Sequence, residues 1–179
     1  MEDDIKEVLF SPEALAGIVN KVGSQISEDY RDKNLLLVSI LKGSVVFMSD
    51  LMRAVTIPCS IDFMAVSSYG SGVKTSGVVR IVKDLDIDLK GCDVLLVEDI
   101  LDSGLTLSYI LELLGARSPK SLKVCTLFDK PSRRTADVKA DYSGAVVPDE
   151  FIVGYGLDYN QKYRNLPFVG ILKPEVYGD

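Results

Sequence analysis

The feature that most constrains this chain is a short apolar run, residues 94–97, followed at once by two acidic residues. A continuous run of Val and Leu of this length is the pattern of a strand covered on both faces, as in a parallel sheet. Glu98 and Asp99 therefore mark the carboxyl end of a buried strand. Ligands of open α/β sheets bind in the crevice outside such ends. The sequence predicts a ligand site at this point.

The segment that follows, residues 102–106, joins a third carboxylate to hydroxyl and glycine residues. Backbone N–H groups of a glycine-containing loop that enters a helix favour an anion such as phosphate. Mg²⁺ prefers one or two carboxylates together with substrate oxygens and water. An ordinary strand–loop–helix, with acids that only cap the helix, is the structural alternative. Capping uses one acid, whereas residues 98–102 contain three, Glu98, Asp99 and Asp102, so we expect a site for a phosphorylated substrate and Mg²⁺.

The rest of the chain alternates strand and helix patterns. Ser11 and Pro12 predict a helix start, with the helix reaching about residue 30. An apolar helix is expected at 44–54. Together with the strand at 94–97, these patterns predict one α/β domain, residues 1–179, with a mostly parallel central sheet flanked by helices. Further strands are expected at 34–40, 60–66, 77–83, 122–128, 150–153 and 168–171.

Residues 67–76 form a polar stretch between two of these expected strands. The stretch is longer than most hairpin connections and is rich in Ser and Gly. Such a loop is more typical of a mobile lid than of a packed turn. We therefore expect it to close over a bound substrate.

Composition excludes several classes of protein. The net charge of −6 argues against broad binding to nucleic acid or to a membrane surface, and no apolar run approaches the roughly 18 residues of a membrane span. The chain has no His, which excludes Ser-His-Asp and Cys-His nucleophilic systems. Cys59, Cys92 and Cys125 are far apart and are expected to be buried thiols in a reducing, cytoplasmic compartment.

Residues 97–106 closely resemble the phosphoribosyl-diphosphate signature of the type I phosphoribosyltransferases. Three further segments, 41–43, 67–70 and 151–158 continuing to Arg164, are similar to the hypoxanthine-guanine branch of that family. The resemblance covers almost the entire chain. It implies the type I phosphoribosyltransferase fold, with a small hood region and a flexible active-site loop, and a homodimer or homotetramer.

The resemblance also implies a role for each residue on the donor side of the site. Other family members carry Lys where this chain has Leu105, and a backbone amide contact would survive that change. The peptide between Leu41 and Lys42 is often cis in the family, and the sequence leaves this open. The implied donor-side residues are Lys42, Gly43 and Arg164 for the diphosphate, Glu98 and Asp99 for the ribose hydroxyls and a Mg²⁺ ion, Asp102, Ser103, Gly104, Leu105 and Thr106 for the ribose and 5′-phosphate, Asp158 for a second Mg²⁺, and Ser67, Ser68, Tyr69 and Gly70 for the flexible loop.

On the acceptor side, the implied purine-binding residues are Lys130, Phe151, Ile152 and Asp158. Phe151 would stack on the base, and Lys130 would donate a hydrogen bond to its exocyclic O6. Adenine would present donors to this donor, so adenine is expected to be a poor substrate. Because no His is available, Asp102 is the best candidate for the catalytic base.

The implied reaction is Mg²⁺-dependent transfer of a 5-phosphoribosyl group from phosphoribosyl diphosphate to hypoxanthine or guanine. The products would be IMP or GMP and diphosphate. Two alternatives stay open. One is an enzyme that prefers xanthine. The other is a nucleotide-sensing regulator that binds RNA through a locally basic stretch, although the overall acidity favours no nucleic-acid partner. This stretch contains Arg117, Lys120, Lys123, Lys130, Arg133, Arg134 and Lys139.

Overall fold

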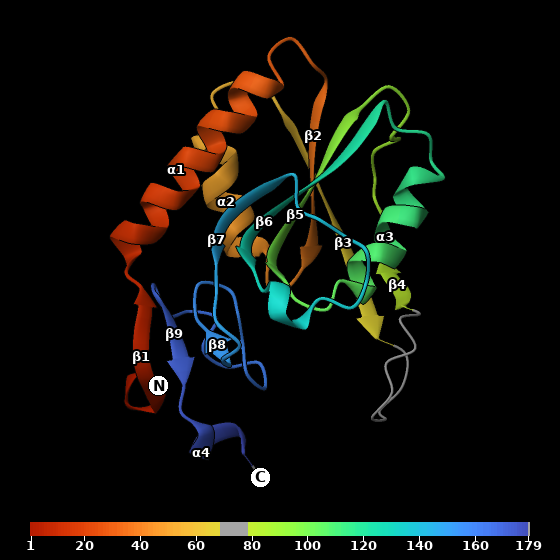
Figure 1. The fold of residues 1–179 in the computed structure, drawn as a ribbon. Helices are drawn as coiled ribbons and strands as arrows, with labels where there is room; N and C mark the ends of the chain where they lie inside the picture. The colour runs from red at the N-terminus through yellow and green to blue at the C-terminus, as the bar shows by residue number, and fades with distance from the viewer. Residues whose placement is uncertain (69–78, 179) are drawn as a thin grey trace.

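The computed structural model describes residues 1–68 and 79–178, which form a six-stranded sheet flanked by helices and a second, three-stranded sheet (Figure 1). The large sheet has the strand order β4-β3-β2-β5-β6-β7. Its strands are β2 (Leu35–Leu41), β3 (Ser60–Ser68), β4 (Val79–Lys83), β5 (Asp93–Leu101), β6 (Ser121–Asp129) and β7 (Tyr142–Val146). Only the β3–β4 pairing is antiparallel among the described strands of this sheet. The predicted mostly parallel α/β sheet is therefore confirmed.

Helices cover both faces of this sheet. Figure 1 shows α1 (Pro12–Asp29) and α2 (Val45–Ala54) on one side and α3 (Leu105–Gly115) on the other. Along β2, Leu35 and Leu37 pack in the core on the α1 and α2 side, whereas Leu36 and Val38 pack on the α3 side. All four are buried. Because successive side chains of a strand point to opposite faces, a continuous apolar run is what a doubly covered strand requires.

The helix α1 begins where the sequence predicts. The Ser11 hydroxyl accepts a hydrogen bond from Ala14 N at 3.3 Å, and Pro12 is the first helical residue. The hydroxyl satisfies one of the free N–H groups of the helix start, and Pro12 has no N–H to leave unpaired. Buried residues recur at helical spacing, among them Leu15, Val19 and Val22, and hold this face of the helix against the sheet.

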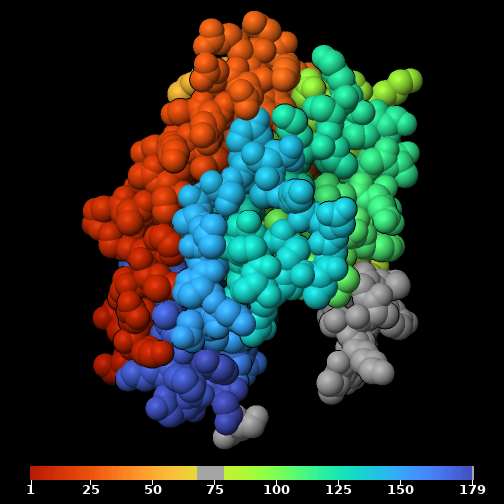
Figure 2. Space-filling model, viewed as in Figure 1, coloured from red at the N-terminus to blue at the C-terminus, as the bar shows by residue number. Residues whose placement is uncertain are grey.

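The small sheet joins the two ends of the chain. It has the order β1-β9-β8, with both pairings antiparallel, and α4 (Pro174–Tyr177) follows it. Figure 2 shows these red and blue segments together as a lobe below the main body. This lobe fits the hood region that the family resemblance implies. Its strands are β1 (Ile5–Phe10), β8 (Ile152–Val153) and β9 (Val169–Leu172).

Several strands differ from the sequence-based expectations. The sequence does not predict the strands β1 and β7, because few of their residues are buried and each strand depends on one neighbour for its hydrogen bonds. The strand β3 continues to Ser68 and pairs Ser67 with Arg80, so the expected loop is wrong for Ser67 and Ser68. The predicted loop residues 69–76, Tyr69 and Gly70 included, lie outside the described residues.

The strand register brings the site segments to one edge of the sheet. Leu35 pairs with Asp93 and Leu101 pairs with Asp129, so β2, β5 and β6 run in parallel and end close together. The β5 strand extends to Leu101, four residues beyond the predicted apolar run, because β6 continues to pair with it. No helix in the described part of the chain is long and apolar enough to cross a membrane.

Candidate active site

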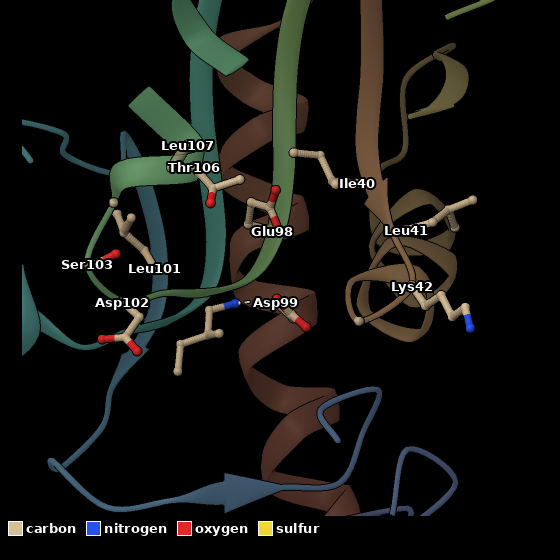
Figure 3. A pocket seen from close by; sticks show the side chains of 13 residues that line it. Ile40, Leu41, Lys42, Glu98, Asp99, Leu101, Asp102, Ser103, Thr106 and Leu107 are labelled. Carbon is tan, nitrogen blue, oxygen red and sulfur yellow. Dashed lines mark hydrogen bonds between the residues drawn. The ribbon is translucent and has the colours of Figure 1, made fainter. Parts of the chain in front are cut away.

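A pair of adjacent carboxylates lies at the carboxyl end of β5. Glu98 and Asp99 are partly buried and line a cavity of about 300 Å³ together with Lys42 and Gly43 (Figure 3). Asp99 Oδ1 accepts a hydrogen bond from Ile100 N at 2.8 Å. A Cβ atom built on Gly43 would lie 1.9 Å from Asp99 Oδ2. The carboxylate and the backbone of Gly43 therefore touch, and a Cβ at position 43 would fit only if the carboxylate moved.

Burial makes this acid pair electrostatically costly. Burial raises the pKa of Glu98 well above its usual range, and the neighbouring Asp99 adds to the effect. Burial also raises the pKa of Asp99 to about 6, although its backbone hydrogen bonds and Arg164 act in the opposite direction. Two carboxylates in one low-dielectric site disfavour each other's ionised form. A cation in the cavity would relieve this repulsion.

A loop then leads from β5 into α3. We call residues 101–106 the phosphate loop. Gly104 has a φ of +80°, a left-handed conformation that Gly adopts without strain, and α3 begins directly after it. Ser103 Oγ accepts from Leu105 N at 3.4 Å. Leu105 is 39% exposed and is not among the described residues that line the cavity. The predicted residues of this segment that do line it are Asp102, Ser103, Gly104 and Thr106.

The opposite wall of this cavity comes from the turn after β2. The peptide between Leu41 and Lys42 is cis, which answers the question that the sequence left open. Lys42 Nζ donates to Gln161 Oε1 at 3.3 Å. The hydroxyls of Ser39 and Ser44 lie 2.7 Å apart and are buried behind the turn. The predicted diphosphate residues Lys42 and Gly43 thus lie across the cavity from the phosphate loop.

The predicted residue Arg164 reaches the same region from the C-terminal part of the chain. Its Nη2 lies 2.8 Å from Asp158 Oδ1, and its Nη1 donates to Gly156 O at 2.7 Å. A Cβ on Gly156 would lie 2.1 Å from Gly43 O, so these segments are in direct contact. The Arg164 Nε is buried without a hydrogen-bond partner among the described residues. Arg164 itself is not among the described residues that line either cavity.

A second cavity of about 290 Å³ adjoins the first and contains the predicted purine-binding residues. Lys130 is only 6% exposed; its Nζ donates to Glu150 O at 2.8 Å and lies 3.6 Å from Asp149 Oδ1. A buried cation that keeps hydrogen-bonding capacity can select a carbonyl oxygen. The predicted residues Lys130, Phe151, Ile152 and Asp158 all line this cavity.

An aromatic cluster forms one side of this second cavity. The Phe151 ring stacks on Tyr177 with centroids 4.9 Å apart and an interplanar angle of 26°, and Tyr159 meets Phe151 edge-on at 5.5 Å. Tyr177 also lines the cavity, which sequence reasoning missed. An aromatic residue at the end of a chain gives no motif signal, because only folding brings α4 beside Phe151.

Asp102 lies where the two cavities meet. Its side chain lines both, and the only other described residue that does so is Ile100. Asp102 Oδ1 is buried and has no hydrogen-bond partner among the described residues. Buried carboxylate oxygens normally have a hydrogen-bond partner. One that lacks a partner where two cavities meet therefore indicates a contact with a ligand. A group held in the first cavity could react there with a group held in the second.

The acidic residues suit a divalent cation that shares its coordination with a substrate. Among the described residues, no group of three or more His, Cys, Asp or Glu side chains could hold a metal alone. Mg²⁺ typically uses one or two carboxylates and completes its shell with substrate oxygens and water. Glu98 and Asp99 fit this requirement. Asp158 fits less directly, because Arg164 and the Gln161 N–H already contact its two oxygens at 2.8 Å each.

Comparison with known proteins identifies the family. The phosphoribosyl transferase domain matches residues 7–160. The chain is 52% identical over its full length, and over the full length of the relative, to a hypoxanthine-guanine phosphoribosyltransferase of Staphylococcus aureus. The chain therefore belongs to the phosphoribosyl transferase family, as its motifs indicated.

Solved structures agree with this assignment. A hypoxanthine phosphoribosyltransferase from Staphylococcus aureus is similar with a TM-score of 0.97 and 52% identity, covering 100% of this chain and 97% of that one. The hypoxanthine phosphoribosyl transferase of Trypanosoma cruzi gives a TM-score of 0.94 and 39% identity, covering 98% and 95%. The predicted type I phosphoribosyltransferase fold is confirmed.

Proposed function

We propose that this protein is a purine-salvage enzyme that transfers a 5-phosphoribosyl group from phosphoribosyl diphosphate to hypoxanthine or guanine. The products are IMP or GMP and diphosphate. The observation that carries this proposal is the pair of cavities that meet at Asp102. One cavity offers carboxylates, glycine amides and Lys42, and the other offers a buried Lys130 beside an exposed aromatic ring.

The first cavity suits the donor substrate. Backbone N–H groups at the start of α3 and the hydroxyls of Ser103 and Thr106 bind the 5′-phosphate. Lys42 and Arg164 neutralise the diphosphate as it leaves, and the carboxylates of β5 stabilise the positive charge that develops on the ribose. Mg²⁺, held by Glu98 and Asp99, would supply further neutralisation of the diphosphate.

Asp102 suits the role of the base. The attacking purine nitrogen gains positive character and must lose a proton. The Asp102 carboxylate lies between the two cavities with Oδ1 unpaired in the described structure, so it can accept that proton directly.

Lys130 supports the preference for a 6-oxo purine. Its Nζ uses one hydrogen for Glu150 O and retains others for an acceptor in the cavity. The O6 atom of hypoxanthine or guanine accepts such a bond, whereas the 6-amino group of adenine cannot. Leaving both donors unsatisfied costs about 1–3 kcal/mol or more.

The alternative of an RNA-binding regulator receives little support from the basic stretch. Most of its side chains are paired with acids in the fold, which leaves a weak positive surface. Arg117 lies 2.8 Å from Asp84, and Lys120 lies 3.7 Å from Asp93. Lys130 and Arg133 both contact Asp149, and Arg134 contacts Asp129.

A panel of bases tests the proposal directly. Initial rates with phosphoribosyl diphosphate and Mg²⁺ are measured for hypoxanthine, guanine, xanthine, adenine and uracil, with and without EDTA. We expect turnover of hypoxanthine and guanine that EDTA abolishes, and at least about 100-fold less turnover of adenine. Faster turnover of xanthine than of either would favour the xanthine-preferring alternative. No turnover of any base, together with salt-dependent RNA binding, would favour the regulator.

We also infer that the enzyme works in the cytoplasm as a homodimer or homotetramer. The three cysteines are free thiols, which supports a reducing compartment. The oligomer follows from the family resemblance, and light scattering of the purified protein measures it. A monomer at micromolar concentration would contradict this part of the proposal.

A further inference from the structure

One arginine holds the phosphate loop from behind. Arg134 Nε donates to Asp102 O at 2.8 Å, and Arg134 Nη2 donates to Leu101 O at 3.0 Å. The backbone N–H of Lys130 donates to the same Leu101 carbonyl at 3.0 Å. Arg134 itself is not among the described residues that line either cavity. It therefore contacts the back of the loop and not the ligand side.

The next carbonyl of the loop is held in the same way. Ser103 O accepts hydrogen bonds from the N–H groups of Thr135 and Ala136, both at 3.0 Å. We call residues 130–136 the backing segment. Three consecutive carbonyls of the phosphate loop, those of residues 101–103, thus point toward the backing segment.

This arrangement fixes the direction of the amides. The described peptide bonds of the loop are trans, and in a trans peptide the C=O and the next N–H point in opposite directions. Because the carbonyls of residues 101–103 point to the backing segment, the N–H groups of Asp102, Ser103 and Gly104 point to the other side. These three residues line the first cavity. The amides are therefore aimed at the place where a phosphate would bind.

Further contacts hold the Arg134 guanidinium in place behind the phosphate loop. Its guanidinium also donates to Val138 O at 2.7 Å and pairs with the Asp129 carboxylate at the end of β6. Its side chain is 17% exposed, and a Cβ on Gly104 would lie 3.2 Å from Arg134 Cδ. A planar guanidinium with five donors can serve four acceptors at once, and an ammonium cannot reproduce that geometry.

We propose that Arg134 is a positioning residue that orients the phosphate-loop amides and so sets the affinity for the 5′-phosphate group of the ligands. This inference rests on the proposed function, because it assumes that the first cavity binds a phosphoribosyl group. It assigns Arg134 to the 5′-phosphate and not to the purine. A general loss of folding would weaken the binding of the 5′-phosphate and of the purine alike.

The test compares two ligands that differ only in the 5′-phosphate. Dissociation constants for IMP and for inosine are measured by calorimetry on the wild type and on Arg134→Lys. The ratio of inosine to IMP dissociation constants reports the contribution of the phosphate. The loop amides hydrogen-bond a charged phosphate, and hydrogen bonds to charged groups are the stronger ones. We therefore expect Arg134→Lys to lower this ratio by about tenfold, with inosine affinity within about twofold of wild type.

A matched control and a second variant keep the test decisive. Arg117→Lys removes a guanidinium with two hydrogen bonds to Asp84 at the far end of α3, and it should leave the ratio unchanged. If Arg134→Lys does not fold, Asp129→Asn weakens the anchor of Arg134 and should lower the ratio about threefold. An unchanged ratio in the folded variants, or equal weakening of both ligands, would overturn the inference. Failure of the wild type itself to bind IMP or convert hypoxanthine would instead refute the proposed function.

Discussion

Gly43 and Asp99 are in direct contact in the wall of the first cavity. A Cβ on Gly43 would lie 1.9 Å from Asp99 Oδ2. The close approach places the turn after β2 against the acid pair of β5. Two elements that are more than fifty residues apart in the chain therefore depend on one another. The proposed diphosphate and ribose contacts meet at this point.

Replacement of Gly43 by Ala should displace the Asp99 carboxylate. The carboxylate is partly buried and cannot move far, so the geometry of the donor site should change. We expect kcat/KM with hypoxanthine to fall by about 100-fold or more, as for other displacements of about 1 Å in an active site. Steady-state kinetics of the wild type and of Gly43→Ala measure this change in kcat/KM.

Gly17→Ala is the matched control for this change. No atom lies within 4 Å of a Cβ built on Gly17, which lies in the middle of α1. Activity should stay at the wild-type level, and the free energy of unfolding should rise by about 0.5–1 kcal/mol. Equal activities of the two variants would show that the contact between Gly43 and Asp99 has no functional role.

Asp102→Asn should lower kcat and leave the binding of phosphoribosyl diphosphate intact. The amide keeps the shape of the side chain but cannot accept a proton. General-base catalysis typically accelerates a reaction by about 100-fold to 10,000-fold, so kcat should fall by at least about 100-fold. Calorimetric titration with phosphoribosyl diphosphate gives the binding constant, and Asp137→Asn, at an exposed position, serves as the control. Unchanged turnover would remove Asp102 from the role of base.

The sequence predicted the donor side of the site better than the acceptor side, and the reason is physical. The carboxylates, the loop and the helix start are contiguous, so one strand and one turn determine their arrangement. The register of parallel strands then explains why the turn after β2 lies beside the acid pair of β5. By contrast, the contact of Phe151 with Tyr177 depends on α4, which lies more than twenty residues further along the chain.

The missed elements share this dependence on distant partners. The edge strand β1 has few buried residues, and its identity as a strand comes from pairing with β9. The sequence places Arg134 in a basic stretch, because charge alone does not show that its donors meet backbone carbonyls. Local patterns predict local geometry, whereas such contacts appear only when the chain has folded.

Tyr177→Ala should weaken purine binding. Tyr177 covers one face of the Phe151 ring, and its loss should leave that ring free to rotate away from the base. Aromatic pairs contribute about 0.5–1.5 kcal/mol, so KM for hypoxanthine should rise about threefold to tenfold. KM for phosphoribosyl diphosphate should change by less than about twofold. Tyr177→Phe keeps the ring and should behave as wild type. A lower KM in Tyr177→Ala would instead show that Tyr177 occupies the place of the base.

The thiols should react slowly with a disulfide reagent in the folded protein. Burial raises the pKa of Cys125 and of Cys59, and the reactive species is the thiolate. Cys125 is fully buried, whereas Cys59 is partly exposed. At pH 8, reaction with Ellman's reagent should therefore modify Cys59 before Cys125, and both more slowly than in guanidinium chloride.

The pH dependence of the reaction gives a further check. Because a raised pKa lowers the thiolate fraction, the reaction rate of Cys59 should keep rising above pH 8.5, where the rate of a free thiol begins to level off. A Cys59→Ser variant assigns the first phase. Reaction of Cys125 in the folded protein at the denatured rate would show that β6 opens readily.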